Sequence, residues 1–247
     1  MSKRILEQLR QEAREISNRR RPVFYDHYHE ELRYSKEVFF SHSLVLRCRE
    51  DVLPFLHDDF GHGVEHSKKV AIESAAIVLG ETAGWKSGLG RHLAVLAQLC
   101  GLMHDMCRLQ GEHASQGAEL SSRILLDYPV SQADKDMVAF AIANHEAFKP
   151  NQAASDPATE ILNGALYDAD KFRWGPDNFV TTLWEICDYL EWPLDKIRAR
   201  FPKGLDMVRS IADTFRTRTG QIYGPEFIDI GLELGGYLYR RMELKSQ

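Results

Sequence analysis

The chain of 247 residues is long enough for one large domain or two small ones, and its 44% of apolar residues can supply a substantial core. The formal net charge of −5 at pH 7 argues against a general nucleic-acid or membrane-surface binder. The sequence lacks both the roughly 18 apolar residues of a membrane span and the apolar stretch of a signal peptide. Four scattered cysteines without a CxxC pair are typical of reduced, buried thiols, so we expect a cytoplasmic protein.

Helical spacing of apolar residues runs through every long segment, and no stretch alternates convincingly as a strand would. The N-terminal part predicts a charged helix over residues 2–20 and one or two further helices over residues 23–48. A basic run, Arg19-Arg20-Arg21, closes the first helix. Three charges are too few for a nucleic-acid footprint, so this run is interpreted as a solvated helix end.

The remaining predicted helices cover residues 64–79, 91–104, 113 onward, 131 to about 145, 159–169, 179–190, 194–201, 205–218 and 225–242. Loops are expected at residues 80–90 and 150–157, and Ser131 with Asp134 predicts a capping box. The sequence therefore predicts an all-α fold in a single domain of residues 1–247. Its core covers about residues 57–190, and helices within residues 1–50 and 194–247 pack on that core.

The adjacent pair His104-Asp105 closes an apolar run that begins at Leu93. Both side chains are strong metal ligands, and both directly follow a helix that the apolar pattern predicts to be buried. Such residues are poorly suited to an apolar core, so we expect other metal-binding side chains to lie near them. The candidate partners are His66, His113, His145 and Asp170. In the predicted arrangement each candidate lies near a helix end or on an inward helix face, which is how helical folds build metal sites.

The chemistry of this residue set points to transition metals. Imidazoles and carboxylates without thiolates suit Fe, Mn, Ni, Co or Zn, and Mg less well. Six ligands are generous for one ion and favour two, with one carboxylate bridging them. Each residue also has a plain interpretation, because a buried histidine is often a satisfied core residue. His113 could cap its helix, His145 could be a hydrogen-bonded helix end, and Asp170 could be a loop residue. Spacing alone leaves both interpretations open.

Local motifs extend the pattern beyond single residues. The segments are Gly61-His62-Gly63-Val64-Glu65-His66-Ser67-Lys68-Lys69-Val70, Leu102-Met103-His104-Asp105-Met106-Cys107-Arg108, Glu112-His113-Ala114-Ser115-Gln116-Gly117-Ala118-Glu119-Leu120, Ala143-Asn144-His145-Glu146 and Asp168-Ala169-Asp170-Lys171. Their order resembles that of the HD-domain metal-dependent phosphohydrolase superfamily. The third segment is similar to the H-x-x-x-G-A-x-x-L helix of its dinuclear members. The resemblance covers roughly residues 57–180 and implies an HD-type helical bundle.

The resemblance also implies a set of ligands for two ions. His66, His104, Asp105 and Asp170 would hold the first ion, and Asp105 would bridge to a second ion bound by His113 and His145. Asp168 competes with Asp170 for the last position, although the following Lys171 favours Asp170. His62, one helical turn earlier, competes with His66, although the valine four residues after His66 favours the latter.

Cations near these ligands are candidates for binding substrate. Arg108, Lys171 and Arg173 would hold phosphate oxygens, because guanidinium forks and ammonium groups suit them. Arg173 could equally be a plain surface charge. Arg108 or Lys171 would offset the charge that develops during the reaction, so both are predicted catalytic residues together with Asp105. Glu146 could orient a ligand imidazole.

The resemblance implies a metal-dependent phosphohydrolase that cleaves a phosphate ester or anhydride through a metal-activated water, with a nucleotide as the expected substrate. The expected cofactor is a pair of divalent transition-metal ions. Two alternatives stay open: an HD-fold di-iron oxygenase, which uses a similar ligand set, and a regulatory domain that keeps the metal without catalysis. The expected partner is a small phosphorylated molecule. We expect no stable binding to nucleic acid or to membranes, and a homodimer is compatible with the sequence.

Overall fold

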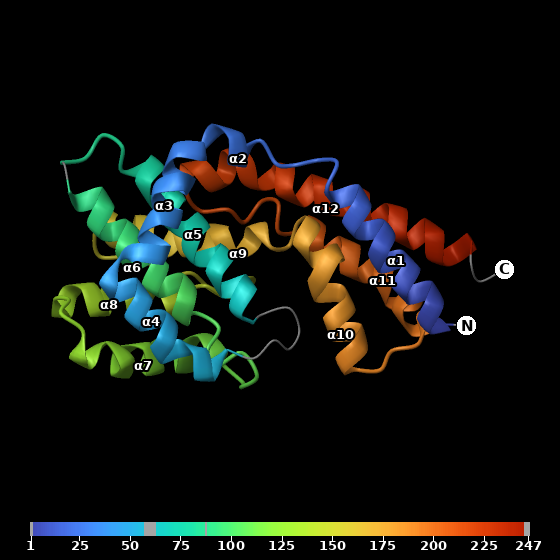
Figure 1. The fold of residues 1–247 in the computed structure, drawn as a ribbon, viewed down its shortest axis with the longest axis horizontal. Helices are drawn as coiled ribbons and strands as arrows, with labels where there is room; N and C mark the ends of the chain where they lie inside the picture. Colours follow the sequence, from blue (N-terminus) through green and yellow to red (C-terminus); the bar gives the residue numbers. More distant parts are fainter. Residues whose placement is uncertain (1, 57–62, 87, 245–247) are drawn as a thin grey trace.

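The computed structural model describes residues 2–56, 63–86 and 88–244, and every regular element within these ranges is a helix (Figure 1). The α-helices are α1 (Ser2–Ser17), α2 (Phe24–His27), α3 (His29–Ser41), α4 (Ser43–Val52), α5 (Val64–Glu81), α6 (Leu89–Met103), α7 (His113–Ile124), α8 (Gln132–Ala143), α9 (Pro157–Phe172), α10 (Leu183–Tyr189), α11 (Leu194–Arg209) and α12 (Arg218–Leu244). Shorter elements are the 3-10 turns η1 (Leu53–Phe55) and η3 (Leu125–Asp127) and the π-helical turn η4 (Asn178–Thr182). The predicted all-α fold class is therefore confirmed.

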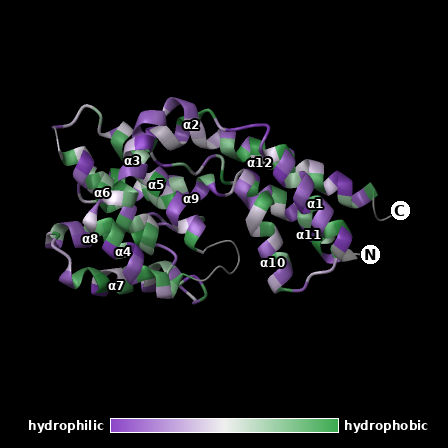
Figure 2. Cartoon of the chain, in the orientation of Figure 1, coloured by the Kyte–Doolittle hydropathy of each residue, from purple (hydrophilic) through white to green (hydrophobic). Residues whose placement is uncertain are grey.

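Helices α5 and α6 form the centre of the larger part of the fold. Residues 70–78 of α5 and 93–103 of α6 are buried without interruption, and helices buried on all sides need neighbours on all sides. α5 packs against α6, α3 and α9, while α6 also packs against α8 and α4. Gly101 of α6 faces the backbone of α5, where a Cβ atom at position 101 would lie 2.4 Å from Ala71 Cα. Figure 2 shows that the outer helix α7 instead carries hydrophobic and hydrophilic residues side by side.

The C-terminal helices gather at the end of the molecule where both ends of the described chain lie (Figure 1). Helix α12 is 27 residues long and joins this part to the centre. It packs against α5 and α9 as well as against α11, α1 and η4.

Helix α11 differs from the predicted bounds. The sequence predicts separate helices over residues 194–201 and 205–218, but a single helix continues through Pro202. Phe201 and Val208 are buried on either side of this proline. Packing of one apolar face therefore outweighs the backbone hydrogen bond that the proline cannot donate.

The segment after α11 is a second correction. Residues 210–217 are irregular, and α12 begins at Arg218 rather than at the predicted residue 225. The Asp168 carboxylate accepts hydrogen bonds from the backbone N–H groups of Arg216 and Thr217, at 2.8 Å each. Backbone donors that bond to a buried carboxylate are not available to helical carbonyl groups, so the helix cannot extend through them.

The sequence predicts other helix ends more closely. The capping box is confirmed, because Ser131 Oγ accepts from the Asp134 backbone N–H at 3.1 Å and the Asp134 carboxylate accepts from the Ser131 backbone N–H at 3.0 Å. Helix α9 is longer than predicted at both ends, since Asp156 caps its first backbone N–H groups and Pro157 occupies its first position. Asp170 therefore lies within the last turn of α9.

The cysteine prediction is also confirmed, because Cys48, Cys100, Cys107 and Cys187 are all buried and free of disulfides. Within the described ranges, no helix has both the length and the apolar character needed to cross a membrane.

The pairing of α1 with α12 depends on Glu12. Its carboxylate accepts hydrogen bonds from the Arg241 guanidinium at 2.9 and 3.0 Å and from the Tyr237 hydroxyl at 3.0 Å. The Arg241 guanidinium, helped by Tyr237 and opposed by burial, lowers the pKa of Glu12 from 4.5 to about 2. The ionised carboxylate therefore stabilises the folded chain fully above pH 4.5, and this contribution is lost as the pH falls toward about 2.

We therefore expect Glu12→Gln to lower the urea midpoint of unfolding at neutral pH. The difference from the unchanged chain should shrink as the pH falls below 4.5, the ordinary pKa of the group. Glu15→Gln removes the same charge from the same helix and serves as the control. Equal effects of the two substitutions would contradict the prediction.

Candidate metal centre

Six side chains from five helical segments meet at one place. They are His66 from the first turn of α5, His104 and Asp105 directly after α6, His113 at the start of α7, His145 after α8, and Asp170 from the last turn of α9. His113 is the most exposed of the six, with 12% of its side chain accessible, and the others expose 9% or less. The fold thus brings together all six residues that the sequence predicts as metal ligands.

Backbone carbonyl groups orient two of the imidazoles. His104 Nδ1 lies 2.9 Å from the carbonyl oxygen of Gly101, and His145 Nδ1 lies 2.7 Å from that of Ile142. Because a carbonyl oxygen only accepts, each Nδ1 carries a hydrogen, and each Nε2 is turned toward the other ligands. His145 Nε2 is buried without a hydrogen-bond partner, and a bound cation would satisfy it.

Asp105 lies between two groups of histidines. Its Oδ2 atom is 3.4 Å from His104 Nε2 and 3.6 Å from His66 Nε2. Its Oδ1 atom is 3.6 Å from His145 Nε2 and 3.8 Å from His113 Nε2. Each group, together with Asp105, forms a triad whose ligand atoms lie within 4.8 Å of one another and could hold a metal ion. The two triads therefore share one carboxylate, each through a different oxygen atom.

Asp170 adds a second carboxylate to the triad of α5 and α6. Its Oδ1 atom is 3.3 Å from His66 Nε2 and 3.7 Å from His104 Nε2, while Oδ2 accepts a hydrogen bond from Lys171. Asp168 faces the other way, because its carboxylate accepts from the hydroxyl of Thr217 at 2.6 Å as well as from backbone N–H groups. The fold places Asp170, and not Asp168, beside the histidines. The alternative first ligand, His62, lies outside the described residues.

The electrostatics of the cluster favour a bound cation. Burial alone would lower the pKa of His104, but Asp105 and Asp170 outweigh it and raise that pKa to about 10. Burial would raise the pKa of Asp170, but the Lys171 ammonium and the neighbouring imidazoles hold it well below its ordinary value. Burial, with a smaller contribution from a neighbouring imidazole, lowers the pKa of His113 to about 4. Two buried negative charges thus attract either a proton on His104 or a metal ion, which carries more charge.

Two of the three cations predicted to bind phosphate lie beside the cluster. Arg108 Nη1 donates to His113 Nε2 at 3.1 Å, and 40% of the Arg108 side chain is exposed, so part of its guanidinium faces solvent at the edge of the cluster. Lys171 is buried, with its ammonium group donating to Asp170. Arg108 is therefore the more accessible of the two.

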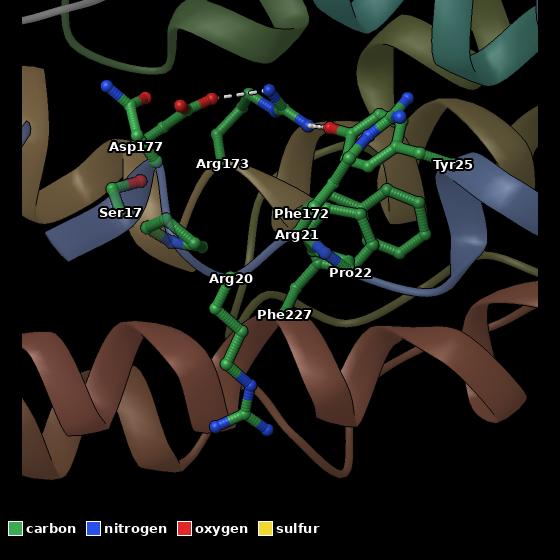
Figure 3. Close-up of a pocket in the computed structure, with 11 residues that line it drawn as sticks. Ser17, Arg20, Arg21, Pro22, Tyr25, Phe172, Arg173, Asp177 and Phe227 are labelled. Carbon is green, nitrogen blue, oxygen red and sulfur yellow. Dashed lines mark hydrogen bonds and ion pairs between the residues drawn. The ribbon is translucent and has the colours of Figure 1, made fainter. Parts of the chain in front are cut away.

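Arg173 belongs to a buried network that sequence reasoning missed, and Figure 3 shows its contacts with Asp177 and Tyr25. Its guanidinium pairs with Glu73 of α5 and with Asp177, and Tyr25 donates to Glu73 at 2.8 Å. Lys69 of α5 pairs with Asp177 at 3.1 Å. The network ties α5 to the end of α9, the two helices that carry the first and the last of the six ligands. The available signal was a carboxylate at position 73 within an apolar helix, because such a residue needs a buried cation. The phosphate-binding role of Arg173 stays a prediction.

Substituting Asp168 and Asp170 one at a time should show which of the two binds metal and which stabilises the fold. Asp170→Asn removes a charge that faces His66, so we expect at least the roughly 10–100-fold loss of metal affinity that changes around metal ligands cause. Asp168→Asn turns an amide toward three hydrogen-bond donors, so we expect a lower unfolding temperature with the metal content preserved. Elemental analysis and thermal unfolding of both variants are the measurements. Metal loss confined to Asp168→Asn would make Asp168 the ligand.

Comparison of the chain with known protein families, with curated proteins and with solved structures found no significant match in any of the three.

Proposed function

We propose that the chain is a metal-dependent phosphohydrolase of the HD type, which cleaves a phosphate ester or anhydride and has a nucleotide as its expected substrate. The observation that carries the proposal is the pair of buried triads that share Asp105. The order of the ligand motifs along the chain, which resembles that of the superfamily, supports it.

The donor set fits transition metals. Four imidazoles and two carboxylates suit Fe, Mn, Ni, Co or Zn better than Mg, which prefers oxygen ligands and retains several waters. His66, His104, Asp105 and Asp170 would hold one ion, and Asp105, His113 and His145 would hold the other. Two ions bound there would supply an activated water and offset the negative charge on a phosphoryl oxygen.

The residues around the ligands have separate roles in this proposal. Glu146 Oε1 lies 3.5 Å from His113 Nδ1 and would keep that imidazole oriented with Nε2 toward the cluster. Arg108 would turn its exposed N–H groups to a substrate phosphate, since a guanidinium matches the geometry of phosphate oxygens. Lys171 would hold Asp170 in its negative form and add positive charge behind the ligand.

Elemental analysis of freshly purified protein, combined with a panel of nucleotides and phosphodiesters, tests the proposal. We expect more than one transition-metal ion per chain and release of phosphate or a nucleoside phosphate from at least one substrate. Anaerobic purification with an oxygen-uptake assay runs in parallel. Oxygen consumption that depends on substrate, without phosphate release, would assign an HD-fold di-iron oxygenase instead. Bound metal without turnover of any substrate under any of the metals would assign a regulatory domain.

A further inference from the structure

The chain between α11 and α12 runs back past α9 before α12 begins (Figure 1). Asp168 of α9 holds this segment, because its carboxylate accepts from the backbone N–H groups of Arg216 and Thr217 at 2.8 Å each and from the Thr217 hydroxyl at 2.6 Å. Hydrogen bonds to an ionised carboxylate are among the stronger ones in proteins. The backbone at Arg216 is therefore fixed next to α9, the helix that carries the candidate ligand Asp170.

The Arg216 side chain reaches the peptide group that leads into the candidate ligand His145. Its Nη1 atom donates to the carbonyl oxygen of Asn144 at 2.9 Å and lies 3.3 Å from Asn163 Oδ1. The carbonyl group of Asn144 and the N–H group of His145 belong to one planar peptide unit. That N–H makes a long hydrogen bond, 3.4 Å to the Ile142 carbonyl oxygen, so the bond from Arg216 is the stronger constraint on this unit. Arg216 thus fixes the backbone that carries the His145 imidazole.

A second contact connects Arg216 with the other side of the cluster. Its guanidinium carbon Cζ lies 3.6 Å from the centroid of the buried Tyr167 ring, and Lys171 Nζ lies 4.9 Å from the same centroid. Tyr167 and Lys171 are one helical turn apart in α9 and so lie on one face of it. Lys171 in turn donates to Asp170. This path passes through a ring and a second cation, so it constrains Asp170 less directly than a hydrogen bond would.

The shape of the arginine side chain suits these contacts. A guanidinium is planar and has five N–H donors, so it can donate to oxygen atoms in its plane while its face stacks on an aromatic ring. An ammonium group carries the same charge without the plane, and an amide has neither the charge nor the fork. Arg216 is partly buried, and burial lowers the pKa of its guanidinium from the usual range. The folded chain therefore bears a desolvation cost at this position that a solvated surface arginine would not impose.

We propose that Arg216 is a positioning residue of the candidate metal centre, and that it acts through the carbonyl oxygen of Asn144 on the ligand His145. The metal position concerned is the triad of α7 and α8, whose members are Asp105, His113 and His145. This role rests on the two metal positions of the proposed function but not on hydrolysis, because Arg216 sets how tightly an ion is held. Residues 210–217, which follow the last ligand in the chain, thereby contribute to the site.

Titration of the chelator-treated full chain with Co²⁺, followed by calorimetry and by the visible absorption of the bound ion, tests this role. We expect binding at both metal positions of the unchanged chain. Arg216→Gln should hold one of the two ions about tenfold more weakly, which is the lower end of the effect of changes around metal ligands. The other ion should keep its affinity within about twofold. Arg216→Lys, which keeps the charge but loses the planar fork, should recover only part of the loss.

A double-mutant comparison identifies the affected ion. His113→Ala removes a ligand from the triad of α7 and α8, so that chain should bind a single ion at the other position. In the His113→Ala chain, Arg216→Gln should change the affinity of the remaining ion by less than about twofold. A residue that only stabilised the fold would weaken that ion equally with and without His113. An equal loss in the two chains would therefore overturn the proposal.

Two further variants are controls. Arg218→Gln removes the same charge from an exposed position at the start of α12, and it should bind both ions as the unchanged chain does. Glu12→Gln weakens the pairing of α1 with α12 and should also keep both affinities. An effect of either control equal to that of Arg216→Gln would overturn the proposal, as would unchanged binding of both ions in Arg216→Gln.

Thermal unfolding of each variant establishes that it is folded before it is titrated. If Arg216→Gln does not fold, Arg216→Lys carries the test, with the loss again expected at one ion only. Absence of Co²⁺ binding to the unchanged chain would overturn the metal centre together with the role of Arg216. Absence of phosphate release, with both ions bound, would overturn the hydrolase proposal alone.

Discussion

Asp105→Ala should leave the chain with little bound metal and no measurable turnover. Asp105 belongs to both triads, with Oδ2 at 3.4 Å from His104 and Oδ1 at 3.6 Å from His145. Its removal takes a ligand from both metal positions at once. The loss of activity should therefore exceed the roughly 10–100-fold that changes beside a metal ligand cause. Metal content per chain and phosphate release from the best substrate of the panel are the two measurements.

Glu146→Gln is the matched control for this substitution. Glu146 touches His113 from outside the cluster, at 3.5 Å from Nδ1, so its amide variant should keep the metal and lose at most about 10–100-fold in activity. We expect Asp105→Asn to have a metal content and an activity between those of Asp105→Ala and the unchanged chain. Its amide keeps the shape of the side chain and one oxygen atom, but it has no negative charge to share between two ions. Full metal content and full activity in Asp105→Ala would contradict both the metal centre and the hydrolase proposal.

Gly101→Ala should weaken both the fold and the metal centre. A Cβ atom at this position would lie 2.4 Å from Ala71 Cα and 2.5 Å from Ala71 N, so α6 would have to move away from α5. We expect a loss of unfolding free energy at or above the upper end of the roughly 1–3 kcal/mol that overpacking costs. His104 would move with α6, because its Nδ1 is bonded to the Gly101 carbonyl oxygen, and its distance from His66 would grow. Urea unfolding and metal content measure the two effects.

Gly204→Ala provides the comparison for a glycine inside a helix. Gly204 lies in α11, where a Cβ atom would meet nothing within 4 Å. Since alanine is preferred over glycine in helix interiors by about 1 kcal/mol, this variant should be as stable as the unchanged chain or slightly more stable. If Gly101→Ala were also as stable as the unchanged chain, that result would contradict the close approach of α5 and α6.

The helices of the central part could be predicted because their signals are local. Apolar spacing marks α5 and α6, and the capping box at Ser131 fixes the start of α8 within one residue. The pair His104-Asp105 stands out in the sequence because it has no place in an apolar core. The full set of six ligands is predicted only through the resemblance of the surrounding motifs to the HD-domain superfamily, since spacing alone leaves plainer interpretations of each residue open.

Interactions between distant segments explain what sequence reasoning missed. The buried network around Arg173 could not be predicted, because its partner Glu73 is a hundred positions earlier in the chain, on another helix. Asp168 and Asp170 are separated by a single residue in α9, so local sequence barely distinguishes them. The distinction comes from the folded path of residues 210–217, where the backbone N–H groups of Arg216 and Thr217 donate hydrogen bonds to Asp168. The partners of these two side chains depend on tertiary packing, which a local sequence pattern does not predict.

Because the six candidate ligands come from five helical segments between residues 66 and 170, an ion bound to them would act as a cross-link across the folded chain. The unfolded chain cannot assemble these ligands, so metal binding would add directly to the free energy of unfolding. At a free metal concentration 100 times the dissociation constant, the gain is about 2.7 kcal/mol. In a metal-starved cell a chain stabilised in this way would unfold more often and would be degraded faster.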